Sequence, residues 1–298
     1  MQWTGVLPAI TTPFNEDLSI DFSFLPRHLD FMLEAGCKGF VALGSLGESA
    51  TLTFEEKVRI LEACVEALNG RAPMVAGIAS LSTAEAVALA KAAEHAGCVG
   101  LMVLPPYVYR GDDRETLTHY SAVIEATALS CMLYNNPIAY GTDVTPEMAG
   151  ALAAKHPQLA AIKESSGDAR RFSALRALLG DRLSLLVGMD DLLIEGVALG
   201  AKGWIAGLVN ALPRESVALF DLAAGGEMES AHELYRWFLP LLRLDIVPKF
   251  VQLIKLVQQE VGMGSERVRP PRLEIVGEER RQVLTLVREH LARRPDLD

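Results

Sequence analysis

The chain has 298 residues, half of them hydrophobic, and its 28 basic and 38 acidic residues give a formal net charge of −10. A chain of this length buries a large core without disulfide or metal staples, and an α/β barrel of this size is often a single domain. The acidic balance, with both signs interspersed, argues against nucleic-acid binding, because phosphate contacts require a basic patch.

Short apolar runs bounded by glycine or proline recur along the chain, and each is followed by a longer segment with helical spacing. Such runs are typical of strands that are buried on both faces. The eight predicted strands are VLPAI (6–10), GFVALGS (39–45), PMVAGI (73–78), GLMVLP (100–105), CMLYNN (131–136), LAAIKES (159–165), LSLLVG (183–188) and GWIAGL (203–208).

Amphipathic segments between these runs predict helices, among them residues 54–68 and 83–96. Thr53, Ser82 and Thr145 each precede a glutamate by two or three positions, which is typical of the residue that caps a helix N-terminus.

After residue 225 the apolar runs stop, and segments 227–240, 248–261 and 277–293 predict three further helices. Eight strand-helix repeats at roughly 30-residue spacing favour a closed (β/α)8 TIM barrel over an open doubly wound sheet. No GxGxxG motif follows the first strand, which weakens a dinucleotide-binding alternative. We therefore predict an α/β chain with a barrel at 1–224 and a small helical appendage at 225–298.

If the barrel is right, chemistry is expected at the carboxyl ends of its strands. The unusual polar residues of the chain do gather there. They fall in the segments GSLGES (44–49), YNNP (134–137), KESSGD (163–168) and GMDD (188–191).

Lys163 follows four apolar residues in its predicted strand. A lysine that faces the barrel interior loses hydration, which disfavours its ammonium form, and the neutral amine can attack a carbonyl or imine carbon. The resulting iminium is an electron sink. The alternative is that Lys163 ends the strand, points to solvent or pairs with Glu164.

Neighbouring strands offer partners for this chemistry. Tyr134 can relay protons, and Ser45, with the backbone N–H groups of its glycine-rich turn, can bind a carboxylate. Each has a plainer alternative, an amphipathic aromatic for Tyr134 and a simple strand-to-helix connection for the turn. Asp190 and Asp191 either contact a substrate amine or hydroxyl or cap the following helix. Glu48 is expected to brace the turn.

These segments resemble the dihydrodipicolinate synthase and N-acetylneuraminate lyase superfamily of class I aldolase barrels. The resemblance covers essentially the whole chain and rests on several motifs in order. They are GSLGES (44–49), LPPYVY (104–109), YNNP (134–137), AIKESSGD (161–168) and GAKGWIAG (200–207).

The resemblance implies a role for several positions. Lys163 would be the Schiff-base lysine, Tyr134 the proton-relay tyrosine, and Ser45 the hydroxyl that hydrogen-bonds the relay. Tyr107 would be the tyrosine lent by a neighbouring subunit. The pocket would be lined by Leu46, Gly47, Gly188 and Ile205. The family uses no metal and no organic cofactor, and is usually a homotetramer built as a dimer of dimers.

Two departures bear on the substrate. Leu46 stands where the synthase has a second threonine, and Ala139 stands where it has the arginine that holds the aldehyde substrate's carboxylate. A methyl group cannot replace a bidentate guanidinium. With Ile138 and Leu208, these residues predict a smaller and more apolar pocket than a sialic acid lyase needs.

The finer resemblance is to the pyrroline-4-hydroxy-2-carboxylate deaminases. It rests on YNNPIAYG, KESSGDARR, GMDDLLIEGVALGAKGWIAGLVNALP and YRWFLPLLRLD. It implies a small keto-acid or cyclic imino-acid substrate that is converted to 2-oxoglutarate semialdehyde and ammonia. Alternatives are a 4-hydroxy-tetrahydrodipicolinate synthase-like activity, a 2-keto-3-deoxy acid aldolase or dehydratase, and a non-catalytic keto-acid-binding barrel. Lys163, Tyr134 and Ser45 together argue against the last.

Two further features predict a cytoplasmic protein with no membrane partner. The N-terminal residues lack a basic segment, and no apolar run approaches the ~20 residues of a membrane span. The four cysteines are far apart in the sequence and match no ligand spacing, so small buried side chains in a reducing compartment are expected (Cys37, Cys64, Cys98 and Cys131).

Overall fold

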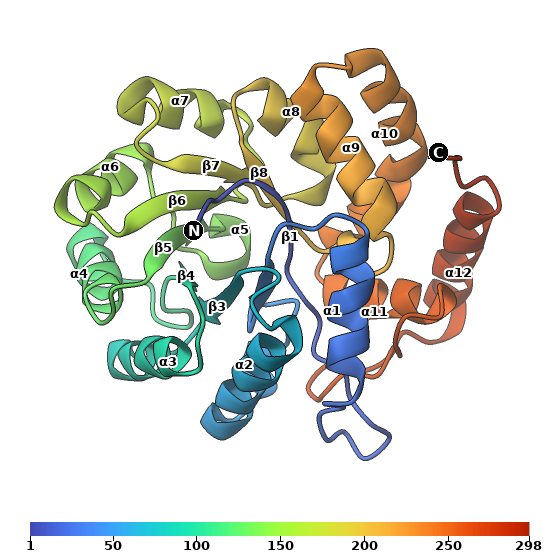
Figure 1. Cartoon of the computed structure of the whole chain (residues 1–298), viewed down its shortest axis with the longest axis horizontal. Coiled ribbons are helices and arrows are strands. Elements are labelled where there is room, and N and C mark those ends of the chain that lie inside the picture. The colour runs from blue at the N-terminus through green and yellow to red at the C-terminus, as the bar shows by residue number, and fades with distance from the viewer. Residues whose placement is uncertain (298) are drawn as a thin grey trace.

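The computed structural model describes residues 1–297 and forms an eight-stranded parallel barrel with helices around it (Figure 1). This confirms the predicted fold class. The strands are β1 (Gly5–Pro8), β2 (Phe40–Ala42), β3 (Met74–Ile78), β4 (Gly100–Val103), β5 (Ser130–Asn135), β6 (Leu159–Glu164), β7 (Ser184–Val187) and β8 (Gly203–Ala206).

Each strand is followed by at least one helix, and further helices follow the barrel. The helices are α1 (Phe24–Glu34), α2 (Phe54–Leu68), α3 (Thr83–His95), α4 (Asp113–Ile124), α5 (Pro137–Tyr140), α6 (Pro146–Lys155), α7 (Arg170–Leu179), α8 (Leu193–Ala198), α9 (Pro213–Gly225), α10 (Met228–Leu242), α11 (Phe250–Glu260) and α12 (Gly277–Leu291). Short 3₁₀ helices lie at Ser49–Thr51, Asp190–Leu192, Leu208–Asn210 and Arg243–Asp245.

The helix starts follow the chemistry read from the sequence. The Thr53 hydroxyl accepts the N–H of Glu56, whose carboxylate accepts the N–H of Thr53 in return, so α2 begins with a capping box. The hydroxyls of Ser82 and Thr145 cap α3 and α6 by accepting the N–H of Glu85 and of Met148, without a reciprocal bond. Each cap uses an N–H that would otherwise lack a partner at the end of a helix.

Seven of the eight strands are shorter than predicted, and local backbone geometry explains two of them, β2 and β8. β2 ends at Ala42 because Leu43 adopts a positive φ of 63°, which turns the chain out of the extended conformation. β8 ends at Ala206 because the N–H groups of Gly207 and Leu208 bind the Asp190 carboxylate instead of continuing the sheet.

The sheet pairs in the order β1-β8-β7-β6-β5-β4-β3-β2, and a bridge between Ala9 and Val41 joins β1 to β2. Across β5 and β6, Tyr134 pairs with Lys163. Paired residues of neighbouring strands point to the same face of a sheet, so this register sets the two side chains next to each other.

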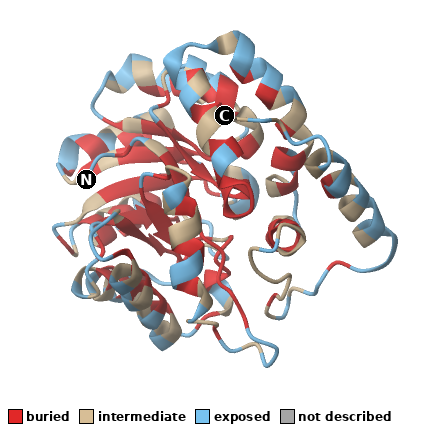
Figure 2. Cartoon of the chain, turned by 45° about the vertical axis from the view of Figure 1, so that its right-hand side comes forward, coloured by how far each residue is buried: buried red, intermediate tan, exposed pale blue. Residues whose placement is uncertain are grey.

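The core lies in the barrel and under its helices. Figure 2 shows the strands almost entirely buried, whereas the surrounding helices expose their outer faces. All four cysteines are free and buried. Burial raises the pKa of each thiol to about 12. Within residues 1–297, no helix is both long enough and apolar enough to cross a bilayer.

The helices that follow the barrel are tied to the turn after β2. Glu48 is fully buried, and its carboxylate accepts a hydrogen bond from Lys255 Nζ of α11 at 2.6 Å and from the N–H of Arg269 at 3.0 Å. The Arg269 guanidinium also binds both carboxylate oxygens of Glu56 in α2, at 2.7 and 2.8 Å. Glu48 thus braces the turn, as expected from the sequence.

Candidate active site

Lys163 lies at the carboxyl end of the barrel and is almost fully buried, with 6% of its surface exposed. Its Nζ lies 4.1 Å from the centroid of the Tyr134 ring. Among residues 1–297, no carboxylate or hydrogen-bonding group contacts this amine. Glu164 lies on the other face of the strand and binds Asn135 and the N–H of Ser166. The pairing of Lys163 with Glu164, considered from the sequence, is therefore not formed.

Gly188 provides the space that Lys163 occupies. A Cβ at position 188 would lie 2.7 Å from Cε of Lys163 and 2.0 Å from Oγ of Ser165. Heavy atoms do not approach that closely, so any side chain here would displace the lysine. The Ser165 hydroxyl is buried beside Lys163 and has no partner within residues 1–297.

Three hydroxyls meet at the mouth of the barrel. Ser45 Oγ forms a short hydrogen bond with the hydroxyl of Tyr140, and the Tyr140 ring packs edge-on against Tyr134, with 5.7 Å between centroids. Burial and the neighbouring Tyr134 raise the pKa of Tyr140 well above that of a free tyrosine. Asn136 Nδ2 donates to the Tyr134 hydroxyl at 3.1 Å.

Tyr140 was not singled out in the sequence, where the resemblance implied only that Ser45 hydrogen-bonds the relay. In the chain as folded, Tyr140 is the residue whose hydroxyl bonds Ser45, and Tyr107 packs its ring against Tyr140, 5.8 Å between centroids. Burial and Glu85 raise the pKa of Tyr107, while Arg272 opposes the shift. The available signal was Gly141, whose φ of 71° ends the single turn of α5 and lets Tyr140 fold back.

The turn after β2 contributes two more of the predicted pocket residues. Leu46 is buried, with 4% of its surface exposed. Gly47 lies so close to the backbone that a Cβ there would be 3.0 Å from the carbonyl oxygen of Ile10. Thr12 Oγ1 donates to the Gly47 carbonyl at 2.7 Å. The turn is therefore held on both sides, which fixes the position of Ser45.

Two further predicted pocket residues, Ile205 and Ala139, differ in burial. Ile205 is buried in β8, paired with Leu7 of β1. Ala139 is exposed on α5, and its N–H donates to Oδ1 of Asn136 at 3.0 Å. Position 139 therefore presents a methyl group, while the guanidinium of Arg110 lies over Gly141, two residues further on.

Asp190 is fully buried, and its carboxylate is already occupied. It accepts hydrogen bonds from Trp204 Nε1 at 3.0 Å, from the N–H of Gly207 at 3.1 Å and from the N–H of Leu208 at 2.9 Å. Burial raises its pKa to about 6. Asp190 would have to give up one of these donors to contact a substrate, so its predicted place in the substrate-binding set has no support in the geometry.

A second carboxylate at this side of the mouth was not anticipated. Asp245 ends the 3₁₀ helix Arg243–Asp245, and its carboxyl group lies directly over Gly207, at the end of β8. Asp191 lies nearby and pairs at 3.8 Å with the Arg243 guanidinium. The signal in the sequence was a lone acidic residue inside the apolar segment LPLLRLDIV.

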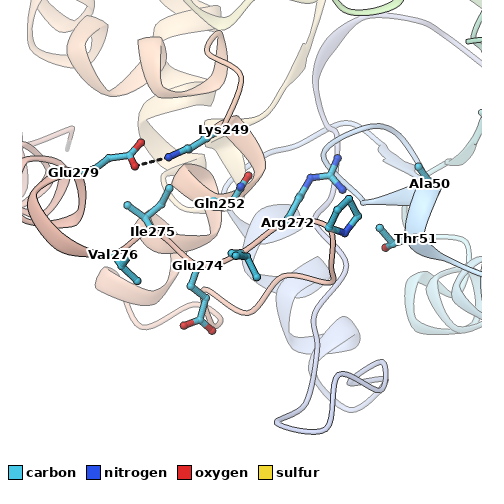
Figure 3. Close-up of a pocket in the computed structure, with 11 residues that line it drawn as sticks. Ala50, Thr51, Lys249, Gln252, Arg272, Glu274, Ile275, Val276 and Glu279 are labelled. Carbon is cyan, nitrogen blue, oxygen red and sulfur yellow. Dashed lines mark hydrogen bonds and ion pairs between the residues drawn. The ribbon is translucent and has the colours of Figure 1, made fainter. Parts of the chain in front are cut away.

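A separate cavity of about 770 Å³ lies outside the barrel, between the segment after β2 and the last helices (Figure 3). Thr51, Gln252 and Arg272 line it, and Lys249 closes one side through a 2.5 Å ion pair with Glu279. None of the predicted site residues lines this cavity. The chemistry of the chain is therefore assigned to the barrel mouth, where the lysine is, and not to the more open hollow.

Comparison with known proteins agrees with this geometry. The model of the dihydrodipicolinate synthetase family matches residues 2–290. A 4-hydroxy-tetrahydrodipicolinate synthase of Geotalea daltonii is 33% identical over 290 residues, covering 96% of this chain and 98% of that protein. The crystal structure of dihydrodipicolinate synthase from Aquifex aeolicus matches with a TM-score of 0.93 and 28% identity, covering 97% of this chain and 98% of that one. A structure described as a monomeric dihydrodipicolinate synthase variant matches with a TM-score of 0.90 and 27% identity, covering 97% and 96%.

Proposed function

The chain belongs to the dihydrodipicolinate synthetase family and is a class I aldolase-type lyase that uses a lysine Schiff base, and from this premise we propose its substrate. The proposed substrate is 1-pyrroline-4-hydroxy-2-carboxylate, and the proposed products are 2-oxoglutarate semialdehyde and ammonia. The motifs YNNPIAYG and YRWFLPLLRLD, which resemble those of the corresponding deaminases, support this assignment.

The observation that carries the proposal is the charge of the barrel mouth. Within residues 1–297 Lys163 has no anionic partner, and position 139 offers a methyl group where the synthases are expected to hold a second carboxylate with arginine. The β8 side of the mouth carries the carboxyl groups of Asp191 and Asp245, and burial raises the pKa of both. A site of this kind suits one small substrate with a single carboxylate and a hydroxyl, rather than two anionic substrates.

The mechanism begins with covalent bond formation. The Lys163 amine adds to C2 of the ring imine, the C2–N1 bond breaks, and an iminium joins Lys163 to the opened chain. Loss of a proton from C3 gives an enamine, whose electron pair expels the 4-hydroxyl as water. Tautomerisation then places the double bond between C5 and nitrogen. Two hydrolyses release ammonia and free Lys163, so one water is consumed overall.

The hydroxyls at the mouth are proposed to move the protons of these steps. Tyr134 is next to the Lys163 amine, and Tyr140 connects Tyr134 with Ser45. A proton taken at C3 or released at nitrogen can pass along Tyr134, Tyr140 and Ser45 toward the solvent. Leu46, Gly47, Gly188 and Ile205 would form the walls around the substrate.

We also propose a homotetramer, built as a dimer of dimers, in the cytoplasm. The segment beside Tyr107 supports a subunit contact, because Val108 and Tyr109 are 88% and 59% exposed and Val108 has a positive φ of 89°. A β-branched residue is strained in that conformation. Sedimentation of the purified chain tests this, because a monomer at micromolar concentration would exclude the tetramer.

A second candidate is the synthase reaction between pyruvate and an aldehyde that carries a carboxylate. The relatives support it, since proteins up to 34% identical are named 4-hydroxy-tetrahydrodipicolinate synthase. Dehydration or cleavage of 2-keto-3-deoxy acids uses the same iminium and remains the third candidate.

Ammonia release from 1-pyrroline-4-hydroxy-2-carboxylate distinguishes these candidates. We expect release by the wild-type chain and none by Lys163→Ala, while pyruvate with aspartate semialdehyde gives no condensation product. Borohydride reduction in the presence of pyruvate should trap an adduct on Lys163 under either reading. Adduct formation without ammonia release would reject the deaminase and leave the lyase class intact.

A further inference from the structure

Asp245 reaches the mouth of the barrel from outside the strand-helix repeats. It follows α10, and its carboxyl group fills the space that a side chain at Gly207 would occupy. A Cβ on Gly207 would lie 2.0 Å from Oδ1 and 2.5 Å from Cγ of Asp245. Gly207 directly follows β8, so the carboxyl group lies at the same end of the barrel as Lys163. The glycine is required for this approach.

The Asp245 carboxyl group has no hydrogen-bond or ion-pair partner within residues 1–297. Asp190 also contacts Gly207, but its carboxylate accepts hydrogen bonds from three donors, so the two carboxyl groups differ in their number of partners. A partly buried carboxyl group without a partner is unfavourable, which makes it a candidate to bind something from outside the chain.

The groups around Asp245 favour its protonated form. Burial raises the pKa of Asp245 well above that of a free carboxyl group, the negative charges of Asp190 and Asp191 act in the same direction, and Lys163 opposes them. Tyr235 of α10 is turned away, since its hydroxyl donates to the carbonyl of Asp191. Arg243 faces Asp191.

We propose that Asp245 is the acid that protonates the 4-hydroxyl of the substrate as it leaves. This inference rests on the proposed deaminase function and goes further by naming the group that the dehydration step needs. Lys163 is bonded to the substrate in that step, the Tyr134 and Tyr140 hydroxyls lie on the β5 side, and Asp190 is occupied. Asp245 is the carboxyl group on the β8 side without a partner in the described chain.

The step balances in electrons and protons. The electron pair of the enamine between C2 and C3 moves to form the C3–C4 double bond, and the C4–O bond breaks. The proton of the Asp245 carboxyl group goes to the departing oxygen, which leaves as water. The carboxylate formed on Asp245 regains a proton when the hydrogen at C5 is lost in the tautomerisation that follows. No other reactant is needed.

Three variants of the full chain test this role. Asp245→Asn keeps the size of the side chain and removes the acid. Gly207→Ala keeps the aspartate at position 245 but adds a Cβ where its carboxyl group lies. The carboxyl group should therefore move away from the site while remaining an acid. Asp221→Asn removes one carboxylate from an exposed position of α9 and is the matched control.

Ammonia release should fall by about 10²-fold or more in Asp245→Asn and Gly207→Ala, as expected for a lost general acid. The earlier steps should remain within about 3-fold of wild type in both, because they do not need Asp245. Those steps are measured as the borohydride-trapped adduct and as deuterium exchange at C3 of 1-pyrroline-2-carboxylate, which has no hydroxyl to lose. Asp221→Asn should match the wild type throughout.

A better leaving group separates an acid from a structural group. The 4-chloro analogue of the substrate loses chloride, which needs no proton, so Asp245→Asn should process it within about 3-fold of the wild-type rate.

Each other outcome overturns the proposal. Undiminished ammonia release in Asp245→Asn would show that the acid is unnecessary, and loss of the adduct or of chloride release would show a structural role. If the wild-type chain forms the adduct but releases no ammonia, the proposed function fails and this inference fails with it. That result is distinguishable, because it appears before any variant is made.

Discussion

Lys163 and Lys255 are both buried lysines whose amines lie over an aromatic ring, yet they are held in opposite ways. Lys255 Nζ is 4.3 Å from the centroid of Phe14 and also donates at 2.6 Å to both the Glu48 carboxylate and the carbonyl of Arg267. In the part of the chain that the structure describes, the ring of Tyr134 is the only partner of the Lys163 amine. Burial lowers the pKa of Lys255 to about 8, and Glu48 acts against that shift.

This difference in hydrogen-bond partners distinguishes a structural lysine from a nucleophilic one. An ammonium group held by a carboxylate and a carbonyl oxygen has no lone pair to offer a substrate, however deeply it is buried. An amine that faces open space needs only to lose one proton to react. Burial alone therefore does not distinguish a structural lysine from a nucleophilic one, whereas the number of hydrogen-bond partners does.

The largest expected effect comes from removing the reactive amine. Lys163→Met should lower ammonia release by a factor on the order of 10⁴ or more, because covalent catalysis is lost outright. Stability should stay equal or rise by about 1 kcal/mol, since an unpaired buried amine is replaced by an apolar chain of similar length. Steady-state kinetics and urea unfolding of the same preparation check both parts. A large loss of stability would show that Lys163 has a structural role like that of Lys255.

Lys255→Met should do the reverse. It leaves the buried Glu48 carboxylate without its cation, which destabilises the fold by about 3–5 kcal/mol. Urea unfolding measures this loss, and the double variant Glu48→Gln, Lys255→Met should recover at least half of it. If the single variant were as stable as wild type, Lys255 would not be a brace and the comparison would break.

Gly188→Ala tests whether Lys163 needs the space beside Gly188 in order to react. The added methyl group would lie 2.7 Å from Cε of Lys163, so the amine must move away from its reactive position. We expect adduct formation with pyruvate to slow by about 10²-fold, the usual effect of misplacing a reacting group by about 1 Å. Gly225→Ala, at the end of α9 where a Cβ meets nothing closer than 3.7 Å, should have no effect.

The smallest effect is expected from the hydroxyls beside Lys163. Tyr140→Phe removes the partner of Ser45 and should lower kcat roughly 5- to 10-fold, the kinetic equivalent of one hydrogen bond. Thr118→Val is the control, because that hydroxyl is exposed on α4 and donates to the carbonyl of Arg114. Equal rates in wild type and Tyr140→Phe would remove Tyr140 from the relay.

The sequence predicted the fold because strand and helix periods repeat eight times, and Thr53, Ser82 and Thr145 mark where three of the helices begin. It also predicted that Lys163 and Tyr134 are neighbours, since both end apolar strands that are consecutive in a parallel barrel. Such pairings follow from the order of the strands alone.

Tyr140 and Asp245 could not be found in the same way. Tyr140 lies on a single helical turn, where the direction of a side chain depends on the residues that end the turn. Asp245 comes from a segment beyond the barrel, and its position depends on how α10 packs against α9 and on the missing side chain at Gly207. The spacing of apolar residues predicts strands and helices. It does not predict the direction of a side chain on a single turn or a contact between distant segments.

The bond between Glu48 and Lys255 also has a consequence for how the chain is made. On a ribosome the eight strands and the Lys163 amine emerge before α11 does, so the turn that carries Ser45 first exists without its brace. At the usual rates of synthesis, Lys255 follows the end of β8 by roughly 2 to 10 seconds. During that interval the Glu48 carboxylate lacks both the Lys255 amine and the Arg269 N–H that bind it in the complete fold. The last quarter of the chain therefore decides when the site becomes rigid.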